Sequence, residues 1–471
     1  PSNAKLFLSH FRYRNPKLLP FSQAENIPML DLSNMKLGLN SVWAIIAVHT
    51  KHRPILRLNI SQNAVRDYGV YHLKDLLSSP STVELNVASC QISSLALEKL
   101  DSSLSRLQKL DLGAASGSSG RNLLGPDGTR ALSKLVDSST HLESLRLVDN
   151  GLEGTGVIEL GRAFGRSPSL RHLVFASNGL TPENCAAFLQ PLQNLESLDL
   201  SGNALGPEAL PGLVAFFARS RKLRSASLAH TLQPPELLPA IAEALRANPS
   251  LATLDLAHNP LEATGLDALA VCLPDLQIES LSLEATCRNP QTNARLLRAA
   301  LAHRHLRVLN FASNPLPILE DSPFQTPNGC LRELDLSACL LTDSALPPLL
   351  DSLGHLSALQ RLALANNLLT ELSFEGLFLF GSSAPKLKKI LLSQNRISPL
   401  HIKSLEKHLA SKSDPSKTRA SSELATKLSE RQKLLERLNH LKTQNENLQQ
   451  KTESYKTKTQ ICKADVLVIR S

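Results

Sequence analysis

Five aspartates recur at one position of a repeated pattern and are the first candidates for chemistry. Each stands between two apolar residues of a short strand-like segment: Asp31, Asp111, Asp199, Asp255 and Asp335. Equivalent side chains on neighbouring parallel strands stack about 5 Å apart, and carboxylates at such a distance could share a metal ion or a proton. Only Asp199 and Asp255 come near each other in the repeat series, and Ser227 lies between them. We therefore interpret the column as a solvated polar surface.

Two histidines offer a second candidate. His230 and His258 occupy equivalent positions of consecutive repeats, in Ala-His-Thr and Ala-His-Asn, so we expect their rings to stack near a turn. Without a third ligand such a pair is more typical of a structural role than of a metal site. The chain contains no GxxxxGK[ST], GxGxxG, HExxH or GxSxG motif. The sequence thus predicts no catalytic residue, bound metal, cofactor or small-molecule substrate.

The charge of the chain is concentrated at its ends. Of a formal +9 over 471 residues, residues 401–471 carry +7 and residues 1–26 carry +3, which leaves the middle nearly neutral. No basic stripe with interleaved aromatics is present, which makes nucleic acid an unlikely partner. No run of 18 apolar residues predicts a membrane span. Seven cysteines without a CxxC pair indicate a reducing compartment.

The positions of these residues are explained by an internal repeat, LxLxxNxL. Fourteen copies follow one another in phase, with a mean period of about 28 residues. Their first apolar strand positions are Leu30, Leu58, Leu85, Leu110, Leu145, Leu173, Leu198, Ala226, Leu254, Leu281, Leu309, Leu334, Leu362 and Ile390. The alternate leucines predict a short strand with an inward face, and the rest of each repeat predicts a helical return.

One position per repeat needs a short polar side chain that bonds to the backbone of the bend after the strand. We expect this turn position to be filled by Asn63, Cys90, Asn150, Asn178, Asn203, Asn259, Asn314, Cys339, Asn367 and Asn395, and by Thr231 and Thr286. Met35 and Ala115 cannot form such bonds, so the first and fourth repeats are expected to be irregular. The fourth repeat is also long, and its excess, residues 114–122, predicts a flexible rim loop. The steps ending at Leu110, Leu198 and Leu334 are 25 residues long and predict returns that are 3₁₀ or extended.

The period, the helical returns and the Asn/Cys alternation resemble the ribonuclease-inhibitor-like subfamily of leucine-rich-repeat proteins, over about residues 27–409. The resemblance implies an α/β solenoid: a horseshoe with a parallel concave sheet and a helical convex side. We expect a C-terminal helix or coiled coil to follow it. We expect an N-terminal cap or extension (1–26), the solenoid (27–397) and a C-terminal cap helix (398–410).

The tail has its own pattern. A polar linker (411–420) precedes a helical segment (421–460) and a short tail (461–471). A heptad seam is formed by Leu434, Leu438, Leu441, Asn445 and Leu448. Asn445 at an a position is typical of a parallel dimer. A lone solvated helix, or one that packs on a partner, stays open as an alternative.

A solenoid usually binds through its concave sheet. Candidate binding residues at outward strand positions are Arg57, Arg146, His172, Asp199, Asp255, Asp335 and Arg361. Aromatic residues, which dominate tight interfaces, are missing from these positions. The face would suit a helix or an extended segment, or it is merely solvated.

Leucine-rich solenoids fused to coiled coils are similar to components of cilia, centrosomes and other microtubule structures. A +7 tail also suits the acidic surface of a microtubule. We therefore expect a non-enzymatic scaffold, cytoplasmic and cytoskeleton-associated, whose partners are proteins such as tubulin or coiled coils. Two alternatives remain: a regulator of a small GTPase, since the Ran GTPase-activating protein uses this repeat type, and a sensing or nucleic-acid-associated adaptor.

Overall fold

The computed structural model describes residues 29–38, 42, 45, 55–77, 81–100, 106–114, 120–231, 237–316 and 329–412. The expected N-terminal cap (1–26), the helical segment 421–460 with its leucine seam, and the final tail (461–471) lie outside these residues. So do loop residues 115–119 and the linker beyond Lys412.

One parallel sheet holds every repeat, and its strands follow chain order. The strands are β1 Leu30–Asp31, β2 Arg57–Asn59, β3 Glu84–Asn86, β4 Lys109–Asp111, β5 Ser144–Val148, β6 His172–Ala176, β7 Ser197–Asp199, β8 Ser225–Ser227, β9 Thr253–Asp255, β10 Ser280–Ser282, β11 Val308–Asn310, β12 Glu333–Asp335, β13 Arg361–Ala363 and β14 Lys389–Leu391. Leu30 pairs with Leu58, Leu58 with Leu85, and so on to Ile390. The predicted repeat register is confirmed.

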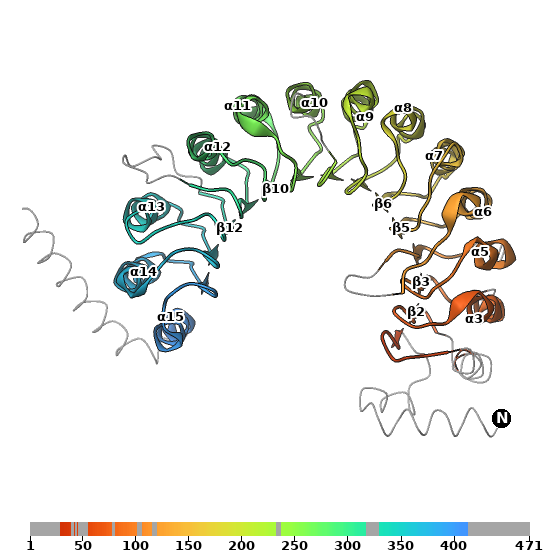
Figure 1. The fold of residues 1–471 in the computed structure, drawn as a ribbon, viewed down its shortest axis with the longest axis horizontal. Helices are drawn as coiled ribbons and strands as arrows, with labels where there is room; N and C mark the ends of the chain where they lie inside the picture. Colours follow the sequence, from red (N-terminus) through yellow and green to blue (C-terminus); the bar gives the residue numbers. More distant parts are fainter. Residues whose placement is uncertain are drawn as a thin grey trace, which may run out of the picture.

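Helices return the chain along the outer side of the sheet. They are α3 Arg66–His72, α4 Lys74–Leu77, α5 Ser94–Leu100, α6 Gly125–Ser138, α7 Gly156–Arg166, α8 Pro182–Leu189, α9 Leu210–Arg219, α10 Leu237–Arg246, α11 Glu262–Cys272, α12 Pro290–Ala302, α13 Leu346–Leu353, α14 Phe374–Ser383 and α15 Pro399–Ser411, with 3₁₀ turns η3 Pro207–Ala209, η4 Leu273–Asp275 and η5 Glu371–Ser373. Figure 1 shows the result, an open arc with strands inside and helices outside. Neighbouring helices need about 8–10 Å and neighbouring strands about 4.8 Å, so the stack must curve.

Two of the short repeats return differently from the prediction. The 25-residue steps that end at Leu110 and Leu198 contain the α-helices α5 and α8, of 7 and 8 residues. The expectation of a 3₁₀ or extended return is therefore wrong for these two steps. A two-turn helix is only about 11 Å long, and these two helices are shorter than α7 and α9, which have 11 and 10 residues in repeats of full length. The return of the third such step includes residues 317–328, which lie outside the described residues.

The core lies between the sheet and the helices and is built mainly of leucine. Leu145, Leu147 and Leu160 are completely buried, as are Phe175 and Phe188. The rings of Phe175 and Phe188 pack at 4.9 Å between centroids. The chain has few aromatic residues, and the rings of Phe175 and Phe188 lie in the core.

The last described helix, α15, covers the end of the core. Leu405 and Leu409 are buried against α14, and Lys412 donates from Nζ to the carbonyl oxygen of Ala384 at 2.9 Å. His408 stacks on Phe378 with 4.3 Å between ring centroids. Within the part of the chain described here, no helix has the length and apolar character needed to cross a bilayer.

Candidate functional site

A ladder of side chains at the turn position joins each repeat to the one before it. In the second repeat, Asn63 donates from Nδ2 to the carbonyl oxygens of Ile60 (2.8 Å) and Leu32 (3.0 Å). Its Oδ1 accepts the N–H groups of Met35 (3.0 Å) and Leu37 (2.8 Å). An amide has both donors and an acceptor, so one side chain satisfies two turns. The backbone N–H of Met35 is therefore hydrogen-bonded, although the Met35 side chain cannot form such bonds itself.

The same bond to the preceding repeat recurs along the arc, at 2.7–3.0 Å. It is made by Asn150, Asn178, Asn203, Asn259, Asn314, Asn367 and Asn395. Cys90 and Cys339 fill the position with a thiol that donates to Ile60 (3.2 Å) and Phe311 (3.5 Å). Burial raises the pKa of both thiols to about 12, so they stay protonated donors.

The fourth repeat corrects the sequence analysis. Ala115 was expected at its turn position, but Asn122 takes this place and is completely buried. Asn122 donates to the carbonyl oxygens of Val87 (2.9 Å) and Leu112 (2.7 Å) and accepts the N–H of Cys90 (2.9 Å). The excess of this repeat is seven residues, which ends at Arg121 and delays the asparagine. The prediction that the fourth repeat lacks a capping side chain is therefore wrong, and Asn122 does not belong to the rim loop.

The residue before the turn position adopts a left-handed backbone in most repeats, His230 (φ 58°) and His258 (φ 56°) among them. Their rings stack as expected, with centroids 5.1 Å apart and planes at 17°. Among the described residues, no group of three or more His, Cys, Asp or Glu side chains could hold a metal ion.

The central outward column has a structural role that the sequence analysis missed. Asp199 Oδ1 accepts the N–H of Ser201 at 2.8 Å, and Asp255 and Asp335 make the equivalent bonds at 3.0 and 2.9 Å. Asp31 and Asp111 do the same. Each aspartate therefore caps the end of its own strand. The second oxygen of these carboxylates can accept from a neighbouring strand, as where Ser227 Oγ donates to Asp255 Oδ2 at 3.2 Å.

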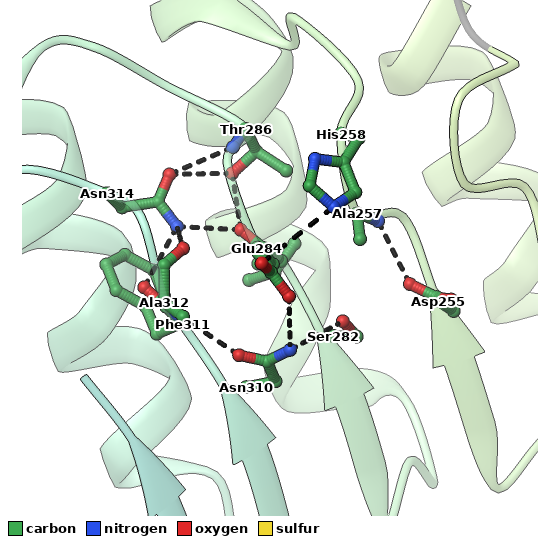
Figure 2. Close-up of polar contacts among 11 residues, drawn as sticks. Asp255, Ala257, His258, Ser282, Glu284, Thr286, Asn310, Phe311, Ala312 and Asn314 are labelled. Carbon is green, nitrogen blue, oxygen red and sulfur yellow. Dashed lines mark hydrogen bonds and ion pairs between the residues drawn. The ribbon is translucent and has the colours of Figure 1, made fainter. Parts of the chain in front are cut away.

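A polar cluster stands at the middle of the concave face and is centred on Glu284 (Figure 2). Its Oε2 accepts a hydrogen bond from Asn310 Nδ2 at 3.1 Å, and its Oε1 lies 3.8 Å from His258 Nε2. Asn310 also reaches Ser282 Oγ at 3.4 Å. The Glu284 side chain is 35% exposed, so the cluster is open to a partner. Sequence reasoning missed Glu284, although neighbouring repeats place the small residues Ala257 and Ala312 at this position.

The outward face of β7 to β10 around this cluster, which we call the central floor, carries short side chains. Outward positions of β7 to β10 carry the small hydroxyl side chains of Ser197, Ser225, Ser227, Thr253, Ser280 and Ser282, beside the carboxylates of Asp199 and Asp255. A helix or an extended segment could therefore approach the sheet closely.

The seven candidate binding residues all lie on the sheet but do not form one site. Arg57 and Arg146 lie near the N-terminal end, each with a nitrogen 3.9 Å from a carboxylate oxygen, of Glu84 and Asp111 respectively. Arg361 lies near the other end, 3.3 Å from Glu333. His172 is on β6 and Asp335 on β12, whereas Asp199 and Asp255 lie on the central strands β7 and β9. The structure thus separates two charged ends from a central floor.

Comparisons with known proteins agree with the repeat. The model of a family described as Leucine Rich repeat matches residues 138–161, 192–213 and 247–270. Ribonuclease inhibitor from Sus scrofa is 30% identical over 180 residues, which cover 36% of this chain and 38% of that protein. NACHT, LRR and PYD domains-containing protein 5 from Bos taurus is 26% identical over 343 residues, which cover 70% of this chain. The aligned region spans only 23% of the length of this bovine relative.

An internalin from Listeria monocytogenes is among the similar solved structures. It aligns with a TM-score of 0.43 and 18% identity, over 75% of this chain and 84% of that chain.

Proposed function

Because this chain is a leucine-rich-repeat protein of the ribonuclease-inhibitor-like type, we propose that it acts as a non-enzymatic scaffold for protein–protein interaction. The observation that carries the proposal is the inner face of the fourteen-stranded sheet, whose central floor is small and polar around His258, Glu284 and Asn310. A partner segment lying on this floor would bury the partly exposed Glu284 carboxylate. We propose that Glu284 selects the partner.

Affinity capture from the source cell tests this role. A partner bound to the intact chain should be lost from the Glu284→Lys variant, because the new cation would occupy the centre of the floor. Glu406→Lys is the matched control, since Glu406 is exposed on α15 of the convex side. If both variants capture the same partner as the unchanged chain, the partner does not bind at the concave centre.

The finer part of the proposal concerns the tail. We propose that the scaffold belongs to a microtubule-based assembly such as a cilium or centrosome, and that the +7 of residues 401–471 attracts the acidic microtubule surface. The intact chain should pellet with microtubules in a salt-dependent way, and a variant ending at Lys412 should not. Truncation after Lys412 preserves the bond from its ammonium group to Ala384. Equal pelleting of the two chains would remove this role from the tail.

We further propose that residues 421–460 pair as a parallel coiled-coil dimer through the leucine seam. A synthetic peptide of this range should sediment as a dimer, and Leu441→Asp should make it monomeric, because a charge at a d position opposes association. A monomeric unchanged peptide would contradict the proposal.

A further inference from the structure

Exposed apolar side chains gather at the two ends of the arc. Ten large apolar side chains are exposed among the described residues, and seven of them lie in, or in the first turn after, strand-to-helix connections. The N-terminal rim patch consists of Tyr68, Leu95 and Leu123, and the C-terminal rim patch consists of Leu340, Leu368, Leu372 and Leu400. Their exposed fractions run from 46% to 82%. Leucines exposed to this extent in adjacent repeats indicate an interface.

Both patches lie on the same rim of the solenoid. All strands are parallel, so every connection that leaves a strand emerges at one edge of the sheet. In the described connections between the patches, the positions equivalent to Leu340 hold Gly151, Gly179, Ala204, Pro260, Cys287 and Pro315, and those equivalent to Leu372 hold Thr155, Glu183, Glu208, Thr264 and Gln291. The rim therefore carries large apolar side chains at its two ends, and small or polar side chains at the equivalent positions in between.

Hydrogen bonds to an aspartate hold the connection at each patch in the same way. At the N-terminal end, Asp67 accepts the N–H of Ser93 (2.6 Å) and its hydroxyl (2.7 Å), and Ser93 pairs with Leu123 as a parallel bridge. At the C-terminal end, Asp343 accepts the N–H of Thr370 (2.8 Å) and its hydroxyl (2.6 Å).

These aspartates occupy equivalent positions of their repeats, and so do Ser93 and Thr370. Thr342, next to Asp343, bridges to Leu368. Both connections are therefore ordered before any partner binds, which lowers the entropic cost of association.

We propose that the rim is a self-association surface, occupied by a second copy of this chain. A two-fold axis along the bisector of the arc would place two rims face to face and exchange their ends. The N-terminal rim patch of one copy then meets the C-terminal rim patch of the other, twice, in one closed isologous interface. A single occupant thereby covers both patches, whereas a short helix or peptide would cover only one.

The area available suits a stable dimer. Two copies would bury fourteen large apolar side chains, on the order of 1,000 Å² at roughly 60–100 Å² each. Polar residues around the patches would bring the total into the range of about 1,200–2,000 Å² found in stable complexes.

Sedimentation equilibrium of the full chain tests the proposal. The unchanged chain should dimerise, and Leu372→Asp should raise the dissociation constant at least tenfold, because it sets a charge into the apolar contact. The matched control is Val271→Asp, which changes an equally exposed apolar residue on the convex helix α11 and should leave the dissociation constant unchanged. Because a coiled coil could also hold two chains together, each variant is measured with and without Leu441→Asp in the tail.

The proposal is overturned if Leu441→Asp alone abolishes the dimer, or if Leu372→Asp and Val271→Asp behave alike in the Leu441→Asp background. Growth into open polymers at high concentration would equally overturn the closed two-fold arrangement.

A cross-linking measurement locates the contact. A mixture of Leu95→Cys and Leu372→Cys chains, each with Cys330→Ser and Cys462→Ser, should form a covalent heterodimer with a short bismaleimide. Leu95→Cys chains alone should not, since the two N-terminal rim patches lie at opposite ends of the dimer. Cross-linking of Leu95→Cys chains with each other would overturn the proposed pairing.

Discussion

Replacement of Asn122 by alanine tests how the fourth repeat absorbs its insertion. The change removes hydrogen bonds to Cys90 (2.9 Å), Ile92 (3.1 Å), Val87 (2.9 Å) and Leu112 (2.7 Å), from a side chain with no exposed surface. Leu112 keeps a bond from Asn150 (2.9 Å). Three buried backbone groups thus lose this partner. At about 1–3 kcal/mol for each unsatisfied group, we expect a loss of about 3–9 kcal/mol in local stability.

Hydrogen exchange is the right assay, because a solenoid unfolds locally and one global free energy does not describe it. The amide protons of Cys90 and Ile92 donate to Asn122 and should exchange at least a hundredfold faster in Asn122→Ala. Asn184→Ala is the matched control, since Asn184 makes one exposed bond, of 3.4 Å to Gly154. If both variants leave Cys90 and Ile92 equally protected, Asn122 does not hold this turn.

A deletion that removes the insertion but keeps Asn122 tests the same role of this side chain. Removal of residues 115–121 joins Ala114 to Asn122 and restores the 28-residue spacing. Ala114 would then take the left-handed position, which Ala285 and Ala338 already occupy with φ of 53° and 55°. We expect stability within about 1 kcal/mol of the unchanged chain, because loop length alone has a small effect. Removal of residues 115–122, one residue more, should be as damaging as Asn122→Ala, and equal stability of the two deletions would refute the argument.

Three further outcomes are expected. Gly161→Ala should destabilise the chain by about 1–3 kcal/mol in urea unfolding, since its Cβ would lie 2.7 Å from the Phe188 carbonyl oxygen, while Gly376→Ala, with 3.7 Å to its nearest atom, should be neutral. Burial lowers the pKa of His303, which accepts the His305 N–H at Nδ1. Stability should therefore be complete above about pH 6.5 and fall below it, a decline that His303→Gln should reduce. Cys339, whose pKa burial raises to about 12, should resist maleimide at pH 8 while exposed Cys330 reacts.

The fold could be predicted from the sequence because its signal is repeated. Each inward leucine is weak evidence alone, but fourteen copies in phase leave one register, and every strand pair follows it. The prediction went wrong where one repeat departs from the average. Counting a constant number of residues from the strand pointed to Ala115 as the turn position. The polar side chain that the turn requires is supplied seven residues later, by Asn122. A search for a short polar side chain followed by Leu124 would have found it.

The candidate site was less predictable, for a physical reason. Sequence reasoning chose charged residues at outward strand positions and so selected Asp199, Asp255 and Asp335. These carboxylates accept the N–H two residues ahead and serve the end of the strand. A single sequence does not separate such a local bond from a binding role, because both favour a short acidic side chain. Glu284 was missed since it is unlike its neighbours, which a search for repeated features overlooks.

The three columns formed by the outward positions of the strands therefore have different roles. The aspartates of the central column cap their own strands, and substitutions of these aspartates should reduce stability before they change binding. The column on one side carries Arg57, His172 and Arg361, and the column on the other side carries Glu284. None of these four side chains caps its own strand in the described structure. Side chains in these columns are free to vary with the partner at little cost to the fold. The determinants of partner choice should accordingly lie beside the aspartate column, and exchange of Glu284 should alter binding while hydrogen exchange of the sheet stays unchanged.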